Sequence, residues 1–506
     1  MEISVLLIVP PLPNQWIKSE TEKYEHLGCG YLLASLPKSI SAGIIDAYNY
    51  ALSYDDILAK IEEYHPKIIG ISCNFYNLLS SAVCLASKIK AKFPRVHVTL
   101  GGHGVIHDKD RLLETNFVDS LCLCEGEFCF PQFVTAYLNG ERYWDTDGMW
   151  FKYDGEIHKN QQLPLVTHLD DLPFPIRTNI ITSHTLPEDF SSGIFTVITS
   201  RGCPYNCTFC DIKAFYANST GSPWRMRSAK NIVDEIELLY KKYNARYFLF
   251  GDDNFIGSTP AGVSRAEDIC NLLLDRKIDI KFGIEARVSD MKPERMKRLK
   301  RAGLVSVMLG VENADQKTLD RWNKRISPQD SAAAIKLLAE LGIDCHVNYI
   351  LYDAFTTLDD LMTSYNFFKD TGIFRYEDPI YLFENRLGVF PGTQTYDQLK
   401  QTSRLIVKPE IVSGTSYTIY NYDYEIENPE VRRFAEYNNY WLRRVRKFKG
   451  TLSAQCLEKF RKTSGVLYLK AFKMSIDLAR TVRPFDASEL DMLLEIFENK
   501  ICQLHK

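Results

Sequence analysis

The chain has 506 residues, of which 45% are hydrophobic and 25% charged, and its formal net charge at pH 7 is −3. This length is too great for a single core and predicts two or three domains, and the composition is that of an ordinary folded protein. The small net charge gives no support for a nucleic-acid partner or an anionic membrane surface.

The N-terminus and the cysteine count indicate a cytoplasmic location. The stretch MEISVLLIVPP lacks a basic start and a small-residue cleavage site, so it predicts a buried strand rather than a signal peptide. No apolar run reaches about 18 residues, so no membrane span is expected. The chain has 13 cysteines, an odd number that argues against a disulfide framework and favours a reducing compartment.

Residues 1–145 alternate between apolar strands and amphipathic helices, which predicts a doubly wound, Rossmann-like parallel sheet. Ligands of such sheets bind at the carboxyl ends of the strands. These ends are expected at Pro10–Leu12, Ser72–Asn74, Gly101–Gly104 and Glu125–Glu127.

Residues 146–190 are expected to form a linker, because the prolines of LDDLPFPIR favour an extended path. A second alternating series over 191–398 contains six strand–helix repeats, the last strand being DPIYLFENRL at 378–387. Eight repeats close a barrel, so six predict an open, partial (β/α)6 barrel with its site at the strand ends.

Residues 399–506 lose this rhythm and are expected to form a mostly helical, substrate-associated domain. The basic run LRRVRKFK at 442–449 is either a solvated helix face or a docking surface for an anionic substrate or a reductase. The alternating tyrosines of TSYTIYNYDYE at 415–425 favour an edge strand, with a pocket lining as the alternative.

The stretch CPYNCTFC carries Cys203, Cys207 and Cys210 on a loop directly after the strand FTVITS. Structural zinc takes four protein ligands, so three cysteines would need a fourth from elsewhere. A four-iron cluster normally takes four cysteines, and three leave one iron free to bind a small molecule. The alternatives at this point are a zinc site or plain structural cysteines.

This stretch resembles the C-x₃-C-x-Φ-C signature of radical S-adenosylmethionine (SAM) enzymes, with Phe209 as the aromatic Φ. The resemblance implies that Cys203, Cys207 and Cys210 ligate a 4Fe–4S cluster whose open iron chelates SAM. One electron, from a flavodoxin-like or ferredoxin-like donor, would then cleave SAM to methionine and a 5′-deoxyadenosyl radical.

The same resemblance implies further contacts to SAM at the ends of the following barrel strands. FGDDNF, GIEARV and LGVEN supply the candidates, for each of which a surface ion pair at a strand end is the alternative. The predicted SAM-binding residues are Phe209, Asp252, Asp253, Glu285, Arg287 and Glu312.

The N-terminal stretches LGCGYLLASL, PKIIGISC, LGGHG and CEGE resemble, in that order, the cobalamin-binding domain of cobalamin-dependent (class B) radical SAM enzymes. The D-x-H-x-x-G motif of methionine-synthase-type domains is absent, so His103 is a lone candidate for the cobalt ligand and the lower axial ligand is left open. The alternative is a domain that has lost its cofactor. The predicted cobalamin-binding residues are Pro10, Leu12, Ser72, Asn74, Gly101, Gly102, His103, Gly126 and Glu127.

The resemblance therefore predicts a methyltransferase that methylates an unactivated carbon of a small-molecule or peptide substrate through the 5′-deoxyadenosyl radical and methylcobalamin. A second possibility keeps the cofactors but catalyses a ring contraction, cyclisation or other rearrangement without net methyl transfer. A third is a binding or sensory protein that uses cobalamin or a cluster as its ligand. The sequence does not identify a catalytic side chain.

Overall fold

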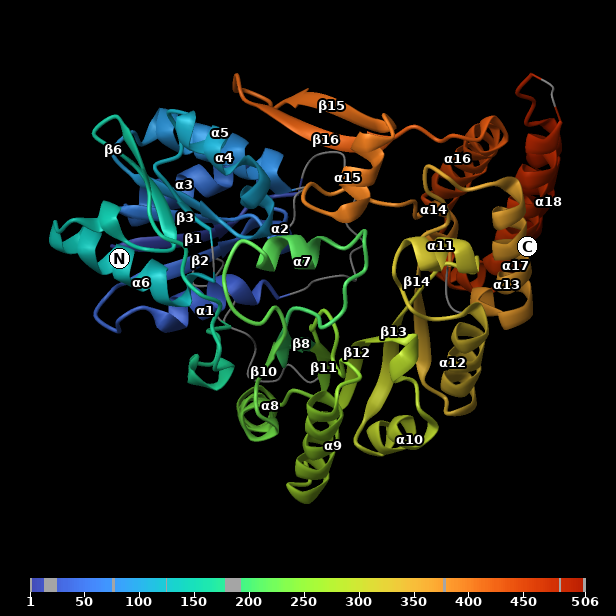
Figure 1. The fold of residues 1–506 in the computed structure, drawn as a ribbon, viewed down its shortest axis with the longest axis horizontal. Helices are drawn as coiled ribbons and strands as arrows, with labels where there is room; N and C mark the ends of the chain where they lie inside the picture. Colours follow the sequence, from blue (N-terminus) through green and yellow to red (C-terminus); the bar gives the residue numbers. More distant parts are fainter. Residues whose placement is uncertain are drawn as a thin grey trace.

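The computed structural model describes residues 2–12, 25–74, 78–123, 125–177, 193–375, 379–481 and 484–503. Figure 1 shows an N-terminal α/β unit at the left, a second α/β unit at the bottom and a helical C-terminal unit at the right. This is the fold class predicted from the sequence. Across the described residues, no helix is both long and apolar enough to cross a membrane.

The N-terminal unit is built on a seven-stranded sheet in the order β2-β1-β3-β4-β5-β6-β7, whose first five strands run parallel. Hydrophobic clusters cover both of its faces, which is why these strands read as nearly continuous apolar runs. The parallel strands are β1 (Val5–Val9), β2 (Ala42–Asp46), β3 (Ile68–Ser72), β4 (His97–Gly101) and β5 (Ser120–Cys122). The main helices are α1 (Leu27–Ser35), α3 (Tyr54–Tyr64), α4 (Leu79–Lys92), α5 (Lys109–Glu114) and α6 (Gly126–Asn139).

The N-terminal sheet continues beyond residue 145, into the segment expected to be a linker. Strands β6 (Met149–Tyr153) and β7 (Glu156–Lys159) form an antiparallel hairpin on the edge of β5. The linker prediction therefore differs from the structure over this hairpin, while the prolines of LDDLPFPIR do lie outside any strand. The rest of the predicted linker, from residue 178, lies outside the described residues.

The second unit contains a five-stranded parallel sheet in the order β14-β13-β12-β11-β8. Its helices begin at sequence-encoded caps; for example, the side chains of Ser228 and Thr357 each accept a backbone N–H of the first turn. The strands are β8 (Ile194–Val197), β11 (Tyr247–Phe250), β12 (Lys281–Arg287), β13 (Leu304–Glu312) and β14 (Asp344–Tyr349). The helices between and after them are α8 (Ala229–Tyr243), α9 (Pro260–Asp275), α10 (Pro293–Arg301), α12 (Pro328–Glu340) and α13 (Leu358–Thr371).

The sixth predicted barrel strand, 378–387, is not a regular strand in the described residues. Tyr381–Glu384 forms the short helix α14 instead. The chain then runs beside the extension of β14, where the N–H of Leu351 donates to the carbonyl of Asn385 at 2.8 Å and Leu387 donates to Tyr352 at 3.0 Å. An irregular sixth segment therefore completes the partial barrel.

The C-terminal unit contains α15 (Gln394–Gln401), α16 (Pro429–Lys449), α17 (Ala454–Arg480), α18 (Ser488–Gln503) and one hairpin, β15 (Leu405–Ile411) with β16 (Thr418–Tyr424). Tyr420, Tyr422 and Tyr424 lie on β16 and Tyr417 directly precedes it, which confirms the predicted strand. Figure 1 shows this hairpin between the C-terminal helices and the N-terminal unit. There the hydroxyl of Tyr417 donates to Asp108 at 3.0 Å, and Ile419 packs into the N-terminal core.

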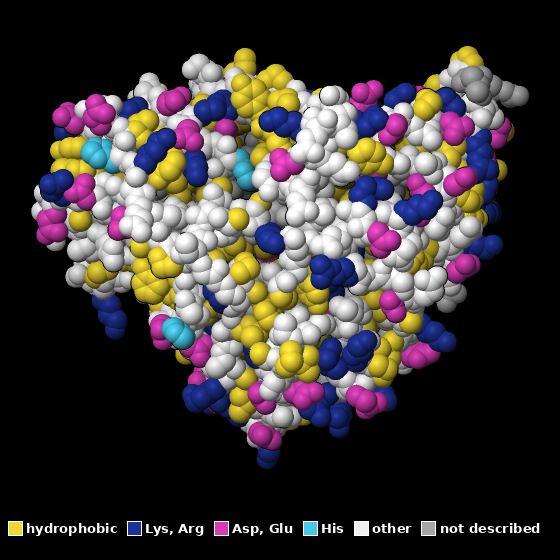
Figure 2. Space-filling view, viewed as in Figure 1, with side chains coloured by type: hydrophobic (Ala, Val, Ile, Leu, Met, Phe, Trp, Pro, Cys, Tyr) yellow, Lys and Arg dark blue, Asp and Glu magenta, His cyan; other side chains and the backbone are white. Residues whose placement is uncertain are grey.

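Two arginines of the basic run at 442–449 form ion pairs with other segments of this chain. Arg444 forms ion pairs with Asp491 and Glu498 of α18, and Arg446 pairs with Glu384. The face shown in Figure 2 carries lysine and arginine interspersed with aspartate and glutamate rather than a patch of one sign. These contacts favour a structural role for the run over a docking surface.

Candidate active site between the two sheets

A cavity of about 440 Å³ lies between the carboxyl ends of the N-terminal strands and the start of the barrel. Its barrel side includes Thr196, Arg201, Phe215 and Asp253. The predicted cobalamin-binding residues that line it are Ser72, Asn74, Gly101, Gly102, His103, Gly126 and Glu127. Pro10 and Leu12 follow β1 but do not line the cavity.

Glycines keep the N-terminal wall of the cavity open. Of the described residues, only the Asn74 side chain would lie within 4 Å of a Cβ on Gly28, so a larger residue there would project into the cavity. Gly102 has φ +99°, and a Cβ there would lie 2.6 Å from the carbonyl oxygen of Cys73. Only glycine fits that backbone without strain.

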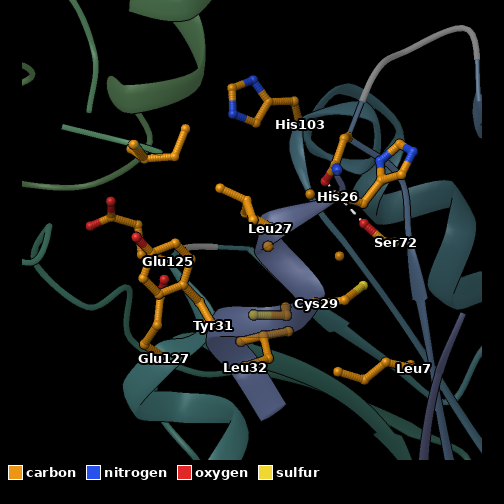
Figure 3. A pocket seen from close by; sticks show the side chains of 18 of the residues that line it. Leu7, His26, Leu27, Cys29, Tyr31, Leu32, Ser72, His103, Glu125 and Glu127 are labelled. Carbon is orange, nitrogen blue, oxygen red and sulfur yellow. Dashed lines mark hydrogen bonds between the residues drawn. The ribbon is translucent and has the colours of Figure 1, made fainter. Parts of the chain in front are cut away.

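Polar groups on the same wall are few and partly unpaired. The Ser72 hydroxyl donates to Asn74 Oδ1 at 2.9 Å, the bond drawn in Figure 3. Among the described residues, the buried hydroxyl of Thr99 has no hydrogen-bond partner although it borders the cavity. A buried, unpaired hydroxyl is costly unless a ligand or water satisfies it. The open backbone and this hydroxyl fit a bulky ligand such as cobalamin.

His103 reaches across to the barrel side of the cavity. Its ring stacks on Phe215 of α7 (Asp211–Tyr216), with centroids 3.6 Å apart and planes inclined by 11°. Burial lowers the pKa of His103 to about 4, so the imidazole is neutral at physiological pH. A neutral imidazole can act as a metal ligand, and the cobalt-ligand role of His103 stays a prediction.

Buried ion pairs join the N-terminal unit to the barrel beside the cavity. Arg201 of β9 (Ser200–Arg201) contacts Glu125 at 2.9 Å and also pairs with Glu127. Arg225 of β10 (Arg225–Met226) pairs with Glu125 from the other side. The Glu127 carboxylate, which borders the cavity, is therefore already engaged by an arginine.

A second buried cluster joins the two units through Arg177. Its guanidinium pairs with Glu25 of the N-terminal unit and lies 2.7 Å from Glu235 of α8. Glu25 also accepts a hydrogen bond from the backbone N–H of Thr196, at 2.8 Å. Removing one partner of such a cluster would leave a buried charge unpaired, so the two units are held in one relative position. Sequence reasoning missed both ion-pair clusters.

The three cysteines follow β9 on a loop that other segments hold in place. The backbone N–H of Thr208 donates to the Trp322 carbonyl at 3.0 Å, and Asn323 Nδ2 donates to the Asn206 carbonyl at 2.7 Å. Thr395, in the stretch PGTQTY at 391–396, donates its N–H to the Thr208 carbonyl at 3.0 Å. The loop is thus fixed by chain segments more than 100 residues away in sequence.

Cys203, Cys207 and Cys210 are free, half-buried thiols. Burial raises the pKa of Cys203 to about 11 and that of Cys210 to about 12. Within the described ranges, no three histidine, cysteine, aspartate or glutamate side chains converge on a position for a single metal ion. Three accessible thiols on one loop at a strand end fit a cluster that takes one cysteine per iron.

Phe209 points away from the solvent into a small hydrophobic cluster. Its ring lies 5.5 Å from that of Trp322, centroid to centroid, in an edge-on contact. The structure therefore gives Phe209 a packing role on the loop, and contact with SAM stays a prediction.

The two adjacent aspartates after β11 have different environments. Asp252 is buried and accepts hydrogen bonds from the Thr199 and Ser200 backbone N–H groups and from the Thr199 hydroxyl. Asp253 borders the cavity and accepts one from the Gly202 N–H at 3.0 Å. Asp253 is consequently the carboxylate available to a ligand, while Asp252 fixes the turn into the cysteine loop.

Glu285 and Glu312 add carboxylates at the ends of the next two strands. The pKa of Glu285 is raised to about 7, mainly by burial and then by Asp253, Asp252 and Glu312. Glu312 has φ +67°, uncommon for a residue with a side chain, and its carboxylate lies 2.7 Å from Lys324 Nζ. These carboxylates make the barrel mouth acidic, and the side chains of Lys324 and Arg287 are buried cations beside them.

Arg287, at the end of β12, faces the cysteine loop. Its Nη1 lies 3.2 Å from Cys207 Sγ, its Nη2 donates to the Lys324 carbonyl, and its guanidinium lies 3.9 Å from the centre of the Tyr205 ring. Both Arg287 and Glu312 are largely inaccessible to solvent, so neither is part of a surface ion pair. Contacts of these residues with SAM stay predictions.

Comparison with known proteins agrees with this geometry. Residues 197–367 match the model of the radical SAM superfamily. The chain is 26% identical over 372 residues to an uncharacterized methyltransferase of Pyrococcus horikoshii, covering 73% of this chain and 79% of the relative. It is 27% identical over 339 residues to the anaerobic magnesium-protoporphyrin IX monomethyl ester cyclase of Rubrivivax gelatinosus, covering 64% of this chain and 58% of the relative.

A solved structure extends the likeness to nearly the whole chain. The cobalamin-dependent S-adenosylmethionine radical enzyme OxsB, solved with aqua-cobalamin bound, superposes with a TM-score of 0.70 at 18% identity, covering 99% of this chain and 76% of OxsB. At that identity the likeness shows a shared fold. The chain therefore contains a radical SAM domain and shares the fold of a cobalamin-dependent radical SAM enzyme, in agreement with the 4Fe–4S cluster, SAM and cobalamin predicted from the sequence.

Proposed function

We propose that the protein is a C-methyltransferase that transfers a methyl group from cobalamin to an unactivated carbon of a small-molecule or peptide substrate. The observation that carries this proposal is a cavity that both units border: Gly101 and Gly102 lie on one side, Asp253 and Arg201 on the other. A ligand held on the N-terminal sheet would face Ser200 and Arg201 of β9, the strand that leads into the cysteine loop, so both cofactors would be held near one substrate.

In this proposal, Cys203, Cys207 and Cys210 would hold the cluster, and the glycine-lined wall would hold cobalamin. The bound cofactors would supply one-electron cleavage of SAM and a transferable methyl group. The protein's own residues would bind and orient the cofactors and the substrate, and would exclude water from the site. Asp253 would offer a carboxylate for the SAM ammonium group. The buried ion pairs of Arg177 and Arg201 hold the N-terminal unit and the barrel in one relative position.

A rearrangement without net methyl transfer is the second candidate function. The relatives favour it as well as methylation, since one is named a methyltransferase and another a cyclase. Both reactions use the same three cofactors, so the residues described above serve either. The two differ in one product: only methyl transfer converts SAM to S-adenosylhomocysteine.

The electron donor and the location follow from the same proposal. In this proposal, a flavodoxin-like or ferredoxin-like protein supplies the electron to the cluster, and the chain works in the cytoplasm. The substrate would enter between the barrel mouth and the C-terminal unit. A peptide and a small molecule both remain candidate substrates.

The test is an anaerobic product assay on protein reconstituted with iron, sulfide and hydroxocobalamin, then given SAM and dithionite. With extracts or candidate substrates added, methyl transfer would yield both 5′-deoxyadenosine and S-adenosylhomocysteine by mass spectrometry. Deoxyadenosine alone, with a substrate that is consumed, would favour the rearrangement. Neither product from protein with an intact cluster and bound cobalamin would contradict both functions.

A further inference from the structure

Arg287 is held on three sides at the barrel mouth. Its Nη2 donates to the carbonyl of Lys324, and one face of the guanidinium lies 3.9 Å from the Tyr205 ring centre. The side chain is buried, with 6% of the residue exposed. This anchoring directs Nη1 at the sulfur of Cys207, 3.2 Å away. The contact joins a fixed cation to the middle cysteine of the loop.

We propose that Arg287 is a positioning residue that hydrogen-bonds the Cys207 sulfur in the cluster-loaded enzyme and thereby raises the midpoint potential of the cluster. The inference rests on the proposed function only in that Cys207 ligates the cluster. Hydrogen bonds to cluster sulfurs and nearby charge are two of the features that set the potential of iron–sulfur clusters.

The direction of the effect follows from charge. Reduction adds one electron to a cluster that already carries three thiolates, and the surrounding carboxylates of Asp253, Glu285 and Glu312 oppose it. Lys324 is occupied by Glu312, 2.7 Å away. Arg287 is thus the cation in contact with a cluster cysteine among the described residues, and its charge favours the reduced state.

Arginine suits this position better than lysine would. A planar guanidinium can stack on Tyr205 while two of its N–H groups point in different directions, to Cys207 and to the Lys324 carbonyl. Lysine would keep the charge but not the stacked, forked geometry. We therefore expect lysine to retain only part of the effect.

The experiment is a redox titration of the reconstituted, SAM-free holoprotein, with dithionite as reductant, redox mediators present and the reduced cluster measured by electron paramagnetic resonance. The variants are Arg287→Gln and Arg287→Lys, each checked for iron content. The control is Arg386→Gln, because Arg386 also lies over a tyrosine ring, Tyr424, and pairs with Asp423 without contacting a cysteine.

We expect Arg287→Gln to shift the midpoint potential to more negative values, Arg287→Lys to lie between it and the wild type, and Arg386→Gln to match the wild type. An unchanged midpoint in fully iron-loaded Arg287→Gln would overturn the inference and leave SAM binding as the role of Arg287. So would an equal shift in Arg386→Gln, because the effect would then not depend on contact with the sulfur.

A variant that fails to take up iron does not end the test. Tyr205→Leu leaves the charge in place but removes the surface on which the guanidinium is stacked. If Arg287→Gln is not loaded, unchanged midpoints in both Tyr205→Leu and Arg287→Lys overturn the inference, and negative shifts support it. If the wild-type protein binds no iron, both this inference and the proposed cluster are overturned. If the protein shows no methyl transfer, the titration is still valid, because it measures only the cluster.

Discussion

The two parallel sheets of this protein carry different kinds of residue at the carboxyl ends of their strands. On the N-terminal sheet, β3 and β4 finish in small or neutral residues, Ser72, Gly101 and Gly102, while the glutamates that follow β5 are paired with arginines of the barrel. The barrel strands finish in charged residues such as Glu285 and Arg287. The same strand–helix architecture therefore makes two kinds of site, and the few residues after each strand decide which kind.

The difference matches the ligands that each side is proposed to hold. A bulky cofactor gains contact where backbone can approach it closely, which requires positions without side chains. A small zwitterion such as SAM is instead held by paired charges and directed hydrogen bonds. Substitutions on one wall should consequently affect one cofactor and spare the other, and this separation is open to test.

The largest effect is expected from removing a cluster ligand. Cys203→Ala should abolish cluster binding and lower formation of 5′-deoxyadenosine by more than about 100-fold, because the loop holds no fourth cysteine that could replace the lost ligand. Retained cobalamin would be seen in the visible spectrum of the desalted protein. The control is Cys270→Ala in the buried face of α9, which should keep the cluster.

A selective loss of cobalamin, with the cluster retained, is expected from a substitution on the N-terminal side of the cavity. Gly102→Ala places a Cβ 2.6 Å from the Cys73 carbonyl at φ +99° and should reduce cobalamin retention about tenfold while iron content stays normal. Gly155→Ala is the matched control, since Gly155 also has positive φ, +82°, but open space around its Cβ position. Equal losses in both variants would show that general destabilisation, rather than the cavity wall, is responsible.

The carboxylates at the barrel mouth should make the free energy of unfolding depend on pH. Because the pKa of Glu285 is raised from 4.5 to about 7, the folded state holds this proton more tightly than the unfolded chain. The stabilising contribution is complete below pH 4.5 and is lost as the pH rises to 7. Glu285→Gln should therefore gain stability relative to the wild type over this interval, by on the order of 2 kcal/mol.

This prediction is measured by urea unfolding of the cluster-free chain at a series of pH values. The difference between variant and wild type isolates Glu285 from other titrating groups. Parallel pH curves for the two proteins would contradict the proposed burial of a carboxyl group among Asp253, Asp252 and Glu312.

The smallest effect is expected outside both walls, where β16 meets the N-terminal unit. Tyr417→Phe removes the hydroxyl that donates to Asp108 at 3.0 Å, while Arg111 still pairs with Asp108 at 2.8 Å. The free energy of unfolding should fall by about 1 kcal/mol, with cluster and cobalamin contents unchanged. Loss of either cofactor in this variant would show that the hairpin also positions the two walls.

Much of the candidate site could be predicted because its chemistry is contiguous in sequence. The spacing of Cys203, Cys207 and Cys210 is read from one loop, and the glycines after β4 follow directly on an apolar strand. Asp252 and Asp253 could be predicted only as a pair. Which of the two borders the cavity depends on the Thr199 and Ser200 groups that surround Asp252 in the fold.

Other features depend on contacts between distant segments. Arg201 and Glu125 are 76 residues apart and have no sequence pattern that pairs them. The hairpin of β6 and β7 lies where a linker is expected from the sequence, although Asp154 and Gly155, both with positive φ, are a local hairpin signal. Only the pairing of this hairpin with the open edge of β5 depends on the fold. The predicted sixth barrel strand has the apolar pattern of a strand, but the chain there turns into α14 before it runs beside the extension of β14.

The sequence by itself determined the two strand–helix series, the cysteine triplet and the glycines and carboxylates that end the strands, since periodicity and spacing are local properties of the chain. Only the tertiary structure decided that the ends of β3 and β4 face the same cavity as the ends of β8 and β11. It also decided that Arg287 points at Cys207, and that buried arginines join the two units. These are pairings across long sequence separations, selected by packing and by the cost of leaving a buried charge unpaired.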